Sequence, residues 1–326
     1  MSSPAALYET IQEEVATVVV GNEDIVEGLT ISLLTDGHVL LEGVPGVAKT
    51  TIANTFATTL GLSYSRIQMT PDMVPADVVG TNVYRQNTGE FELKRGPVFA
   101  NVAVADEINR ATPKTQSALL EAMQEGNVTV DNETLALPEP FMVVATQNPI
   151  EMEGVFELPE AQRDRFQLKY VVDLPDRETE RELLDRYDRD PEFDSTEVSP
   201  VVDADTLAAA QAAVTDVHVA PPVKEYILDI IATTRAHSDL RHGASPRATL
   251  AFIATTKARA AIHGREYVIP DDVKALGTPV LRHRVIRTTD AELSETTVST
   301  ILNDVFERVD PPGSDATFEP VAPSVD

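Results

Sequence analysis

The 326-residue chain has no cysteine, no tryptophan and few basic residues. Without cysteine it forms neither disulfides nor thiolate metal sites, so packing must supply its stability and the protein carries no redox chemistry of its own. Its 26 lysines and arginines stand against 53 aspartates and glutamates, a formal net charge of −27. Such a chain repels duplex DNA, and with only 5% aromatic residues it offers few stacking platforms to single strands. We therefore expect no nucleic-acid partner, unless a local basic patch exists.

The carboxylates are spread along the whole chain and do not gather in one tail. This distribution leaves two interpretations open: a salt-adapted acidic coat, or a surface that selects basic partners. The sequence contains no run that approaches the ~20 apolar residues of a membrane span, and no basic-then-apolar leader opens it. We expect a soluble, cytoplasmic protein that does not insert into membranes.

Short apolar runs alternate with longer helix-like segments in the first half of the chain. The runs are Val39 to Glu42, Ile67 to Met69, Val102 to Ala105, Phe141 to Ala145 and Leu168 to Val172. Continuous apolar runs of this length are typical of parallel strands that are buried on both faces. The sequence thus predicts an α/β domain over residues 1–175, in which helices flank a parallel sheet.

No such runs recur after Pro175. An acidic, proline-bearing stretch from Asp185 to Pro200 leads into four or five segments of helical period, which predict a smaller all-α domain over residues 176–310. A length of 326 residues with 42% hydrophobic content also favours two domains. The tail from Pro311 to Asp326 has too few apolar residues to fold, and we expect it to be disordered.

A phosphate-binding loop follows the first predicted strand and opens a helix that should end near Gly61. Backbone N–H groups at such a helix N-terminus form an anion nest, Lys49 can reach the β- and γ-phosphates of ATP, and the Thr50 hydroxyl can bind Mg²⁺. The alternative is a plain glycine-rich turn before a helix. The predicted nucleotide-binding residues are Gly43, Val44, Pro45, Gly46, Val47, Ala48, Lys49, Thr50 and Thr51.

Ala48 departs from the strict motif, which has glycine at this position. Alanine is the smallest alternative. It should be tolerated if residue 48 already has helical φ and ψ angles, where no positive φ is needed.

Two further strands end in polar residues. Asp106 and Glu107 close the run that begins at Val102, and Asn148 follows the run that begins at Phe141. Asp106 could hold the water shell of the metal and Glu107 could orient the attacking water. Alone, the acidic pair could be ordinary charges at a helix start. Since open α/β sheets bind ligands at the carboxyl ends of their strands, we expect one site to collect these residues with the P-loop.

Five motifs then occur in the order found in AAA+ ATPases: GVPGVAKT, ADEINRA, ATQNP, LPEAQRDRF and GASPRA. Over roughly residues 15 to 290 the chain resembles the MoxR family within them. The resemblance implies a P-loop AAA+ core followed by an all-α lid domain. It also implies Lys49 and Thr50 as Walker A, Asp106 and Glu107 as Walker B, and Asn148 as the sensor-1 residue that positions water against the γ-phosphate.

Two arginines take roles only through this resemblance. Arg165 resembles the arginine finger that reaches the ATP of a neighbouring subunit, which implies a homo-oligomer, in this family a hexameric ring. Arg247 follows Ser245 and Pro246, a plausible helix start, and resembles sensor 2 of the lid. Either arginine could instead form a domain-stabilising ion pair. Whether Arg247 acts on its own subunit or across an interface is left open.

Two segments predict hairpins: Val83 to Leu93 around Asn87-Thr88-Gly89, and Val128 to Leu137 around Asp131-Asn132. In the branch that the chain resembles, such hairpins face the central pore of the ring; the alternative is ordinary surface hairpins.

The N-terminal segment from Leu7 to Val20 predicts an amphipathic helix, and Val19-Val20-Gly21 resembles the family's adenine-side contact. Asn109 and Arg110, just after the acids, either contact an adjacent subunit or lie solvated at a helix start.

The resemblance implies a chaperone-type ATPase that assembles, activates or remodels client proteins, typically with a von Willebrand factor A domain partner. A nucleic-acid motor and a metal-chelatase motor subunit belong to related branches and remain alternatives. The acidic charge argues against the first, and the second differs only through its partner. A non-catalytic nucleotide sensor is opposed by Glu107, Asn148 and Arg165 together.

Overall fold

The computed structural model describes residues 3–87, 89–131, 133–149, 155–189 and 198–313. Contacts divide them into two compact units: one spans residues 7–208, and the other combines residues 209–313 with the first few residues of the chain. The predicted disorder of the tail falls largely on residues 314–326, and the turns at Thr88 and Asn132 were also predicted; all of these lie outside the described residues.

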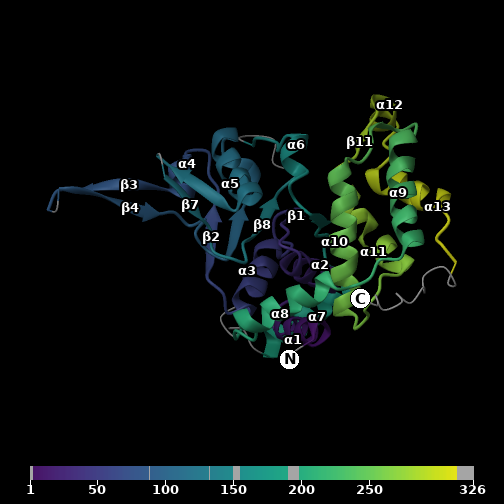
Figure 1. The fold of residues 1–326 in the computed structure, drawn as a ribbon, viewed down its shortest axis with the longest axis horizontal. Helices are drawn as coiled ribbons and strands as arrows, with labels where there is room; N and C mark the ends of the chain where they lie inside the picture. Colours follow the sequence, from purple (N-terminus) through teal and green to yellow (C-terminus); the bar gives the residue numbers. More distant parts are fainter. Residues whose placement is uncertain (1–2, 88, 132, 150–154, 190–197, 314–326) are drawn as a thin grey trace, which may run out of the picture. The chain divides into compact units, whose positions relative to one another are not determined.

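A five-stranded parallel sheet forms the centre of the first unit (Figure 1). Its order is β2-β5-β8-β1-β9, and β5, which lies between β2 and β8, is buried along its whole length. The predicted strands are confirmed, although β2 begins earlier than expected. Their bounds are β1 (Val39–Glu42), β2 (Tyr64–Gln68), β5 (Val102–Asp106), β8 (Met142–Gln147) and β9 (Leu168–Val171).

Helices flank this sheet, as predicted. Leu40, Ala103 and Val143 of the strands pack with Leu119 and Leu120 of α5 in a fully buried core. The helices of this part of the chain are α1 (Pro4–Ala16), α2 (Glu23–Leu34), α3 (Lys49–Thr59), α4 (Pro75–Val79), the 3₁₀ helix η1 (Ile108–Arg110), α5 (Pro113–Glu125), α6 (Glu160–Arg163), α7 (Arg177–Arg189) and α8 (Ala204–Thr215). Helix α1 ends four residues before Val20, so the predicted helix from Leu7 to Val20 is too long at its C-terminal end.

Both predicted hairpins form. The first pairs β3 (Gly80–Arg85) with β4 (Glu90–Arg95) and extends far from the sheet, and the second pairs β6 (Asn127–Val130) with β7 (Glu133–Ala136) (Figure 1). The Asn82 side-chain amide donates to Asp131 over 2.7 Å and so links the two. At the end of the first hairpin the exposed rings of Tyr84 and Phe91 pack against each other, with their centroids 5.3 Å apart.

The second unit is helical apart from one short antiparallel pair of strands, β10 (Leu240–His242) and β11 (Ile286–Arg287). Asp272 is fully buried in this unit and forms ion pairs with Arg259 and Arg265 at 2.7 and 2.6 Å. Its helices are α9 (Pro221–Ala236), α10 (Pro246–Ile262), α11 (Pro270–Leu281), α12 (Thr289–Leu293) and α13 (Val298–Arg308).

Of the described residues, 176–189 and 198–208 belong to the sheet unit, whereas the sequence placed the boundary at residue 175. Arg186 of α7 donates to the Ala16 carbonyl over 2.8 Å, and the Val201 amide donates to the Thr59 carbonyl over 2.9 Å. Across the described ranges, no helix combines the length and the apolar character needed to cross a membrane.

His38 is a fully buried histidine that ties three elements of the sheet unit together. Its Nε2–H donates to the Met123 carbonyl of α5 over 3.0 Å, and its Nδ1 accepts the Val143 amide of β8 over 3.0 Å. If Nδ1 were protonated, its N–H would face the Val143 N–H, and the hydrogen bond between them would be lost. Burial accordingly lowers the pKa of His38 from 6.5 to about 4.

We expect this histidine to make stability fall as the pH falls from about 6.5 to about 4. In that window the unfolded chain takes up a proton that the folded chain refuses, so His38 contributes up to about 3 kcal/mol of pH-dependent loss. Urea unfolding at pH 7 and pH 4.5 measures it, with His38→Gln as the variant that cannot titrate. Equal pH slopes for the native and His38→Gln proteins would contradict the assignment.

Candidate active site

The P-loop joins β1 to α3 at the carboxyl end of the sheet. Lys49 is buried at the first residue of α3, and its Nζ donates to the carbonyls of Gly43 and Val44 over 2.6 and 2.7 Å. Gly43 has no room for a side chain, because a Cβ there would collide with the Val172 carbonyl, and Gly46 has a φ of +87°. The loop therefore presents its backbone and one cation to the same space.

Ala48 does not have the helical conformation under which we expected alanine to be tolerated. It is the N-cap residue of α3 with φ 61° and ψ 16°, in the left-handed region. Only glycine adopts this region freely, so the alanine costs about 1 kcal/mol or somewhat more. Residue 48 precedes the helix and does not belong to its first turn, so it does not have the helical φ and ψ angles that we expected.

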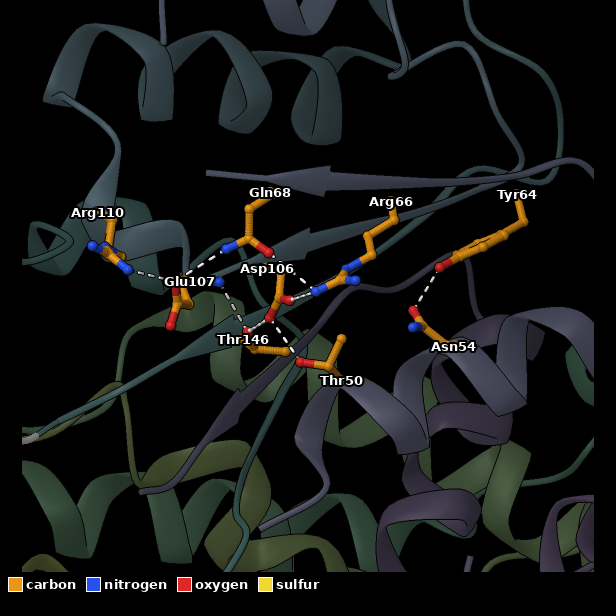
Figure 2. Close-up of polar contacts among 9 residues, drawn as sticks. All are labelled: Thr50, Asn54, Tyr64, Arg66, Gln68, Asp106, Glu107, Arg110 and Thr146. Atoms are coloured by element: carbon orange, nitrogen blue, oxygen red, sulfur yellow. Dashed lines mark hydrogen bonds and ion pairs between the residues drawn. The ribbon is translucent and has the colours of Figure 1, made fainter. Parts of the chain in front are cut away.

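Asp106 ends β5 with its side chain only 7% exposed. Its Oδ1 accepts the hydroxyls of Thr50 and Thr146 over 2.8 and 2.7 Å, and its Oδ2 pairs with Arg66 over 2.6 Å (Figure 2). Burial opposes ionisation, but the hydrogen bonds from Thr146, Arg66 and Thr50 outweigh it and lower the pKa of Asp106. The carboxylate is therefore held ionised beside the P-loop.

Glu107 follows in the left-handed conformation, with a φ of 56°. Its Oε2 accepts the Gln68 side-chain amide and the Arg110 guanidinium, each over 3.0 Å, and its backbone N–H donates to the Thr146 hydroxyl over 2.9 Å (Figure 2). The turn aims the two acids differently: Asp106 lies against Thr50, and Glu107 lies further along the edge of the sheet.

A cavity of about 470 Å³ joins these groups. It brings six of the nine predicted P-loop residues together with Asp106, Glu107 and Asn148; Gly43, Val44 and Val47 are not part of its lining. The backbone carbonyl of Asn148 accepts the side-chain amide of Asn109 over 3.0 Å. The residues that line the cavity are Pro45, Gly46, Ala48, Lys49, Thr50, Thr51, Arg66, Gln68, Asp106, Glu107, Thr146 and Asn148.

Sequence reasoning missed Arg66, Gln68 and Thr146. Arg66 and Gln68 are two residues apart on β2, so both point to one face, where Arg66 contacts Asp106 at the end of β5 and Gln68 contacts Glu107 just beyond it. Their spacing of two was the available signal. This spacing was not used because the predicted strand began only at Ile67 and left Arg66 out.

A second cavity, of about 370 Å³, lies on the other side of the P-loop. The segment Val19 to Gly21, expected on the adenine side, lines it together with Gly46, Val47, Ala48 and Thr51. Residues from β9 and α7, including Thr179 and Leu183, complete its wall. The two cavities share P-loop residues, as a base pocket and a phosphate pocket would.

Neither predicted arginine is among the residues that line the two cavities at the P-loop. Arg165 follows α6, and its guanidinium donates to the Leu120 carbonyl over 2.5 Å; it lines a separate polar cavity with Glu121 and Glu125. Arg247 belongs to the second unit, where the Ser245 hydroxyl accepts its backbone N–H at the start of α10 over 3.2 Å. The expected helix start at Ser245 is confirmed, and the roles of both arginines remain predictions.

The donors in the phosphate cavity suit Mg²⁺. No cluster of three or more histidines and carboxylates occurs in the described part of the chain, so this chain offers no all-protein metal cage there. Mg²⁺ does not require one, since it is held by one or two protein oxygens together with phosphates and waters. The Thr50 hydroxyl and the Asp106 carboxylate supply that partial set.

The sheet, the P-loop and the acids at its edge define a P-loop nucleoside triphosphatase with a helical second unit. Residues 38–168 match the ATPase family associated with various cellular activities (AAA), and residues 232–305 match the AAA lid domain.

The chaperone MoxR1 of Mycobacterium tuberculosis is 45% identical over 305 residues, which cover 91% of this chain and 80% of that protein. The uncharacterised protein YeaC of Bacillus subtilis is 42% identical over 300 residues, covering 92% and 93%. A crystal structure of a candidate ATPase from Cytophaga hutchinsonii superposes with a TM-score of 0.86 at 38% identity, covering 95% and 97%. The chain therefore belongs to the MoxR family of AAA+ ATPases, and it is an ATP hydrolase.

Proposed function

We propose that this protein uses the hydrolysis of Mg²⁺–ATP to assemble, activate or remodel client proteins. One observation carries the chemical part: a single cavity gathers Lys49, Thr50, Asp106, Glu107 and Asn148. The likeness to MoxR1, a chaperone, supports the biological part. A nucleic-acid motor is disfavoured, because the longer hairpin carries nearly as many acids as bases and the whole chain is strongly acidic.

Each residue of the cavity has a task that suits its chemistry. The P-loop amides and Lys49 hold the phosphates, while Thr50 and Asp106 hold Mg²⁺ and its waters. The metal, when bound, neutralises charge that develops on the phosphates. Glu107 orients and deprotonates the attacking water, and Asn148 fixes that water against the γ-phosphate. Thr146 holds both acids in register through its single hydroxyl.

Arg165 supports an oligomeric form. Its guanidinium binds the Leu120 carbonyl and is not part of the lining of its own phosphate cavity, so it would serve the ATP of an adjacent copy. We propose a homo-oligomeric ring of six subunits in the cytoplasm, with Arg247 as the lid arginine and a von Willebrand factor A domain protein as partner. The hairpin β3–β4, which ends in the exposed Tyr84 and Phe91 rings, would meet the client.

Lys49→Ala tests the nucleotide site. We expect ATP to bind about 30-fold more weakly, because a charge-assisted contact to the phosphates is lost from a partly closed cavity. Lys114→Ala removes the same charge from an exposed position on α5 and should leave binding unchanged. Titration of both variants and the native chain with a fluorescent ATP analogue measures this. Equal affinities for all three would exclude the cavity as the phosphate site.

A further inference from the structure

Arg66 is a cation that occupies the side of Asp106 at which the proposed Mg²⁺ would bind. It extends from β2 across to β5, and its NH2 group pairs with Asp106 Oδ2 over 2.6 Å (Figure 2). The other oxygen, Oδ1, already accepts the hydroxyls of Thr50 and Thr146. An ionised carboxylate has about four acceptor positions, so Oδ2 holds what remains for a metal or its water shell.

The two partners of this ion pair differ in their freedom to move. The Asp106 side chain is 7% exposed and fixed by two hydroxyls, whereas the Arg66 side chain is 48% exposed. A long, half-exposed arginine gains little from a single ion pair and can turn toward solvent at low cost. Any cation that competes for Asp106 would therefore displace Arg66 and leave the carboxylate in position.

The same guanidinium reaches the second acid indirectly. Arg66 NH2 also donates to Gln68 Oε1 over 3.1 Å, and Gln68 Nε2 donates to Glu107 over 3.0 Å. Arg66 thus orients the amide whose other end holds Glu107. Release of Arg66 would remove the guanidinium from Asp106 and free Gln68 to rotate, while Glu107 would keep its contact with Arg110.

We propose that Arg66 is a resident counter-ion of the metal site, which neutralises Asp106 until Mg²⁺ arrives with the nucleotide and takes its place. The inference rests on the proposed function, since it needs Mg²⁺ to bind beside Asp106. It makes Arg66 a positioning residue that sets the Mg²⁺ concentration at which the site is filled. Without this guanidinium, the metal meets an unopposed carboxylate and no like charge has to leave.

The test is a Mg²⁺ titration of the full chain with a fluorescent, non-hydrolysable ATP analogue, in which the signal reports analogue binding and not turnover. We expect Arg66→Gln to lower the half-saturating Mg²⁺ concentration about tenfold, a change equal to about 1.4 kcal/mol. Arg66→Lys keeps a cation and should stay near the native value. Arg85→Gln, on the exposed hairpin, makes the same change in net charge and should not shift the midpoint.

Thermal unfolding of each variant, with and without the analogue, shows that it is folded and binds. If Arg66→Gln binds the analogue but has the native Mg²⁺ midpoint or a higher one, the counter-ion role is wrong and the proposed function stands. A shift of equal size in Arg85→Gln would also overturn it, because net charge would then be the cause. If the native chain binds the analogue without any response to Mg²⁺, the metal site itself fails and the inference falls with it.

Discussion

Glu107→Gln is expected to lower kcat for ATP hydrolysis about 1000-fold while the protein still binds ATP. The amide keeps the size of the side chain and can still contact Gln68 and Arg110, but it cannot take a proton from water. Phosphate release under saturating ATP measures the loss, and a fluorescent nucleotide measures binding. Because Glu107 lines the cavity and is not itself a P-loop residue, we expect its effect in kcat and not in affinity.

The matched control is Glu225→Gln, which makes the same chemical change at an exposed position on α9. It should hydrolyse ATP at the native rate. If Glu107→Gln retained more than about a tenth of native kcat, a general base worth roughly a hundredfold or more could not be assigned to this carboxylate. Another group would then have to activate the water.

Arg165→Ala is expected to lower kcat by about 1000-fold, the lower end of the range for a guanidinium that stabilises phosphoryl transfer. The loss should appear with the P-loop, both acids and Asn148 intact, because Arg165 contacts Leu120 and not the phosphate cavity of its own chain. Turnover per subunit of the native protein should also rise with protein concentration as copies associate. Steady-state assays over a range of concentrations, with sizing of the same samples, measure both effects.

The contact with Leu120 calls for a stability control. Arg165→Ala leaves that carbonyl without its guanidinium partner, so its thermal midpoint and its ATP affinity are measured beside its activity. Arg163→Ala, two residues earlier at the end of α6, removes the same charge from the same segment. Full activity in Arg165→Ala, or an equal loss in both variants with unfolding, would remove the finger assignment.

The sheet and its helices could be predicted because apolar patterning is a local property. The runs at Val39 and Val102 are short and each ends in an acidic residue, so the sequence indicates both the strands and the edge of the sheet at which the site lies. Helix α5 has equally local signals at its ends, since Thr112 caps its start and Gly126, with a φ of 62°, ends it.

What could not be predicted depends on neighbours or on backbone conformation. Strand β2 lies at the edge of the sheet with mostly exposed residues, so its first half looks like a loop and Arg66 was passed over. The left-handed φ angles of Ala48 and Glu107 could not be predicted, because neither residue is a glycine, the residue type that usually indicates this conformation. Residues 176–189 and 198–208 belong to the sheet unit through contacts such as those of Arg186 with Ala16 and of Val201 with Thr59, which no local pattern encodes.

The most direct test of a site completed by a neighbouring copy is to mix Glu107→Gln with Arg165→Ala. Each variant alone should be nearly inactive, but a mixed assembly contains sites in which a native Glu107 faces a native Arg165 from the next subunit. We predict that mixing restores a substantial fraction of ATP turnover, with a maximum at intermediate ratios. If mixed assemblies form and turnover stays at the level of the separate variants, Arg165 does not act across subunits and the ATPase completes its site within one chain.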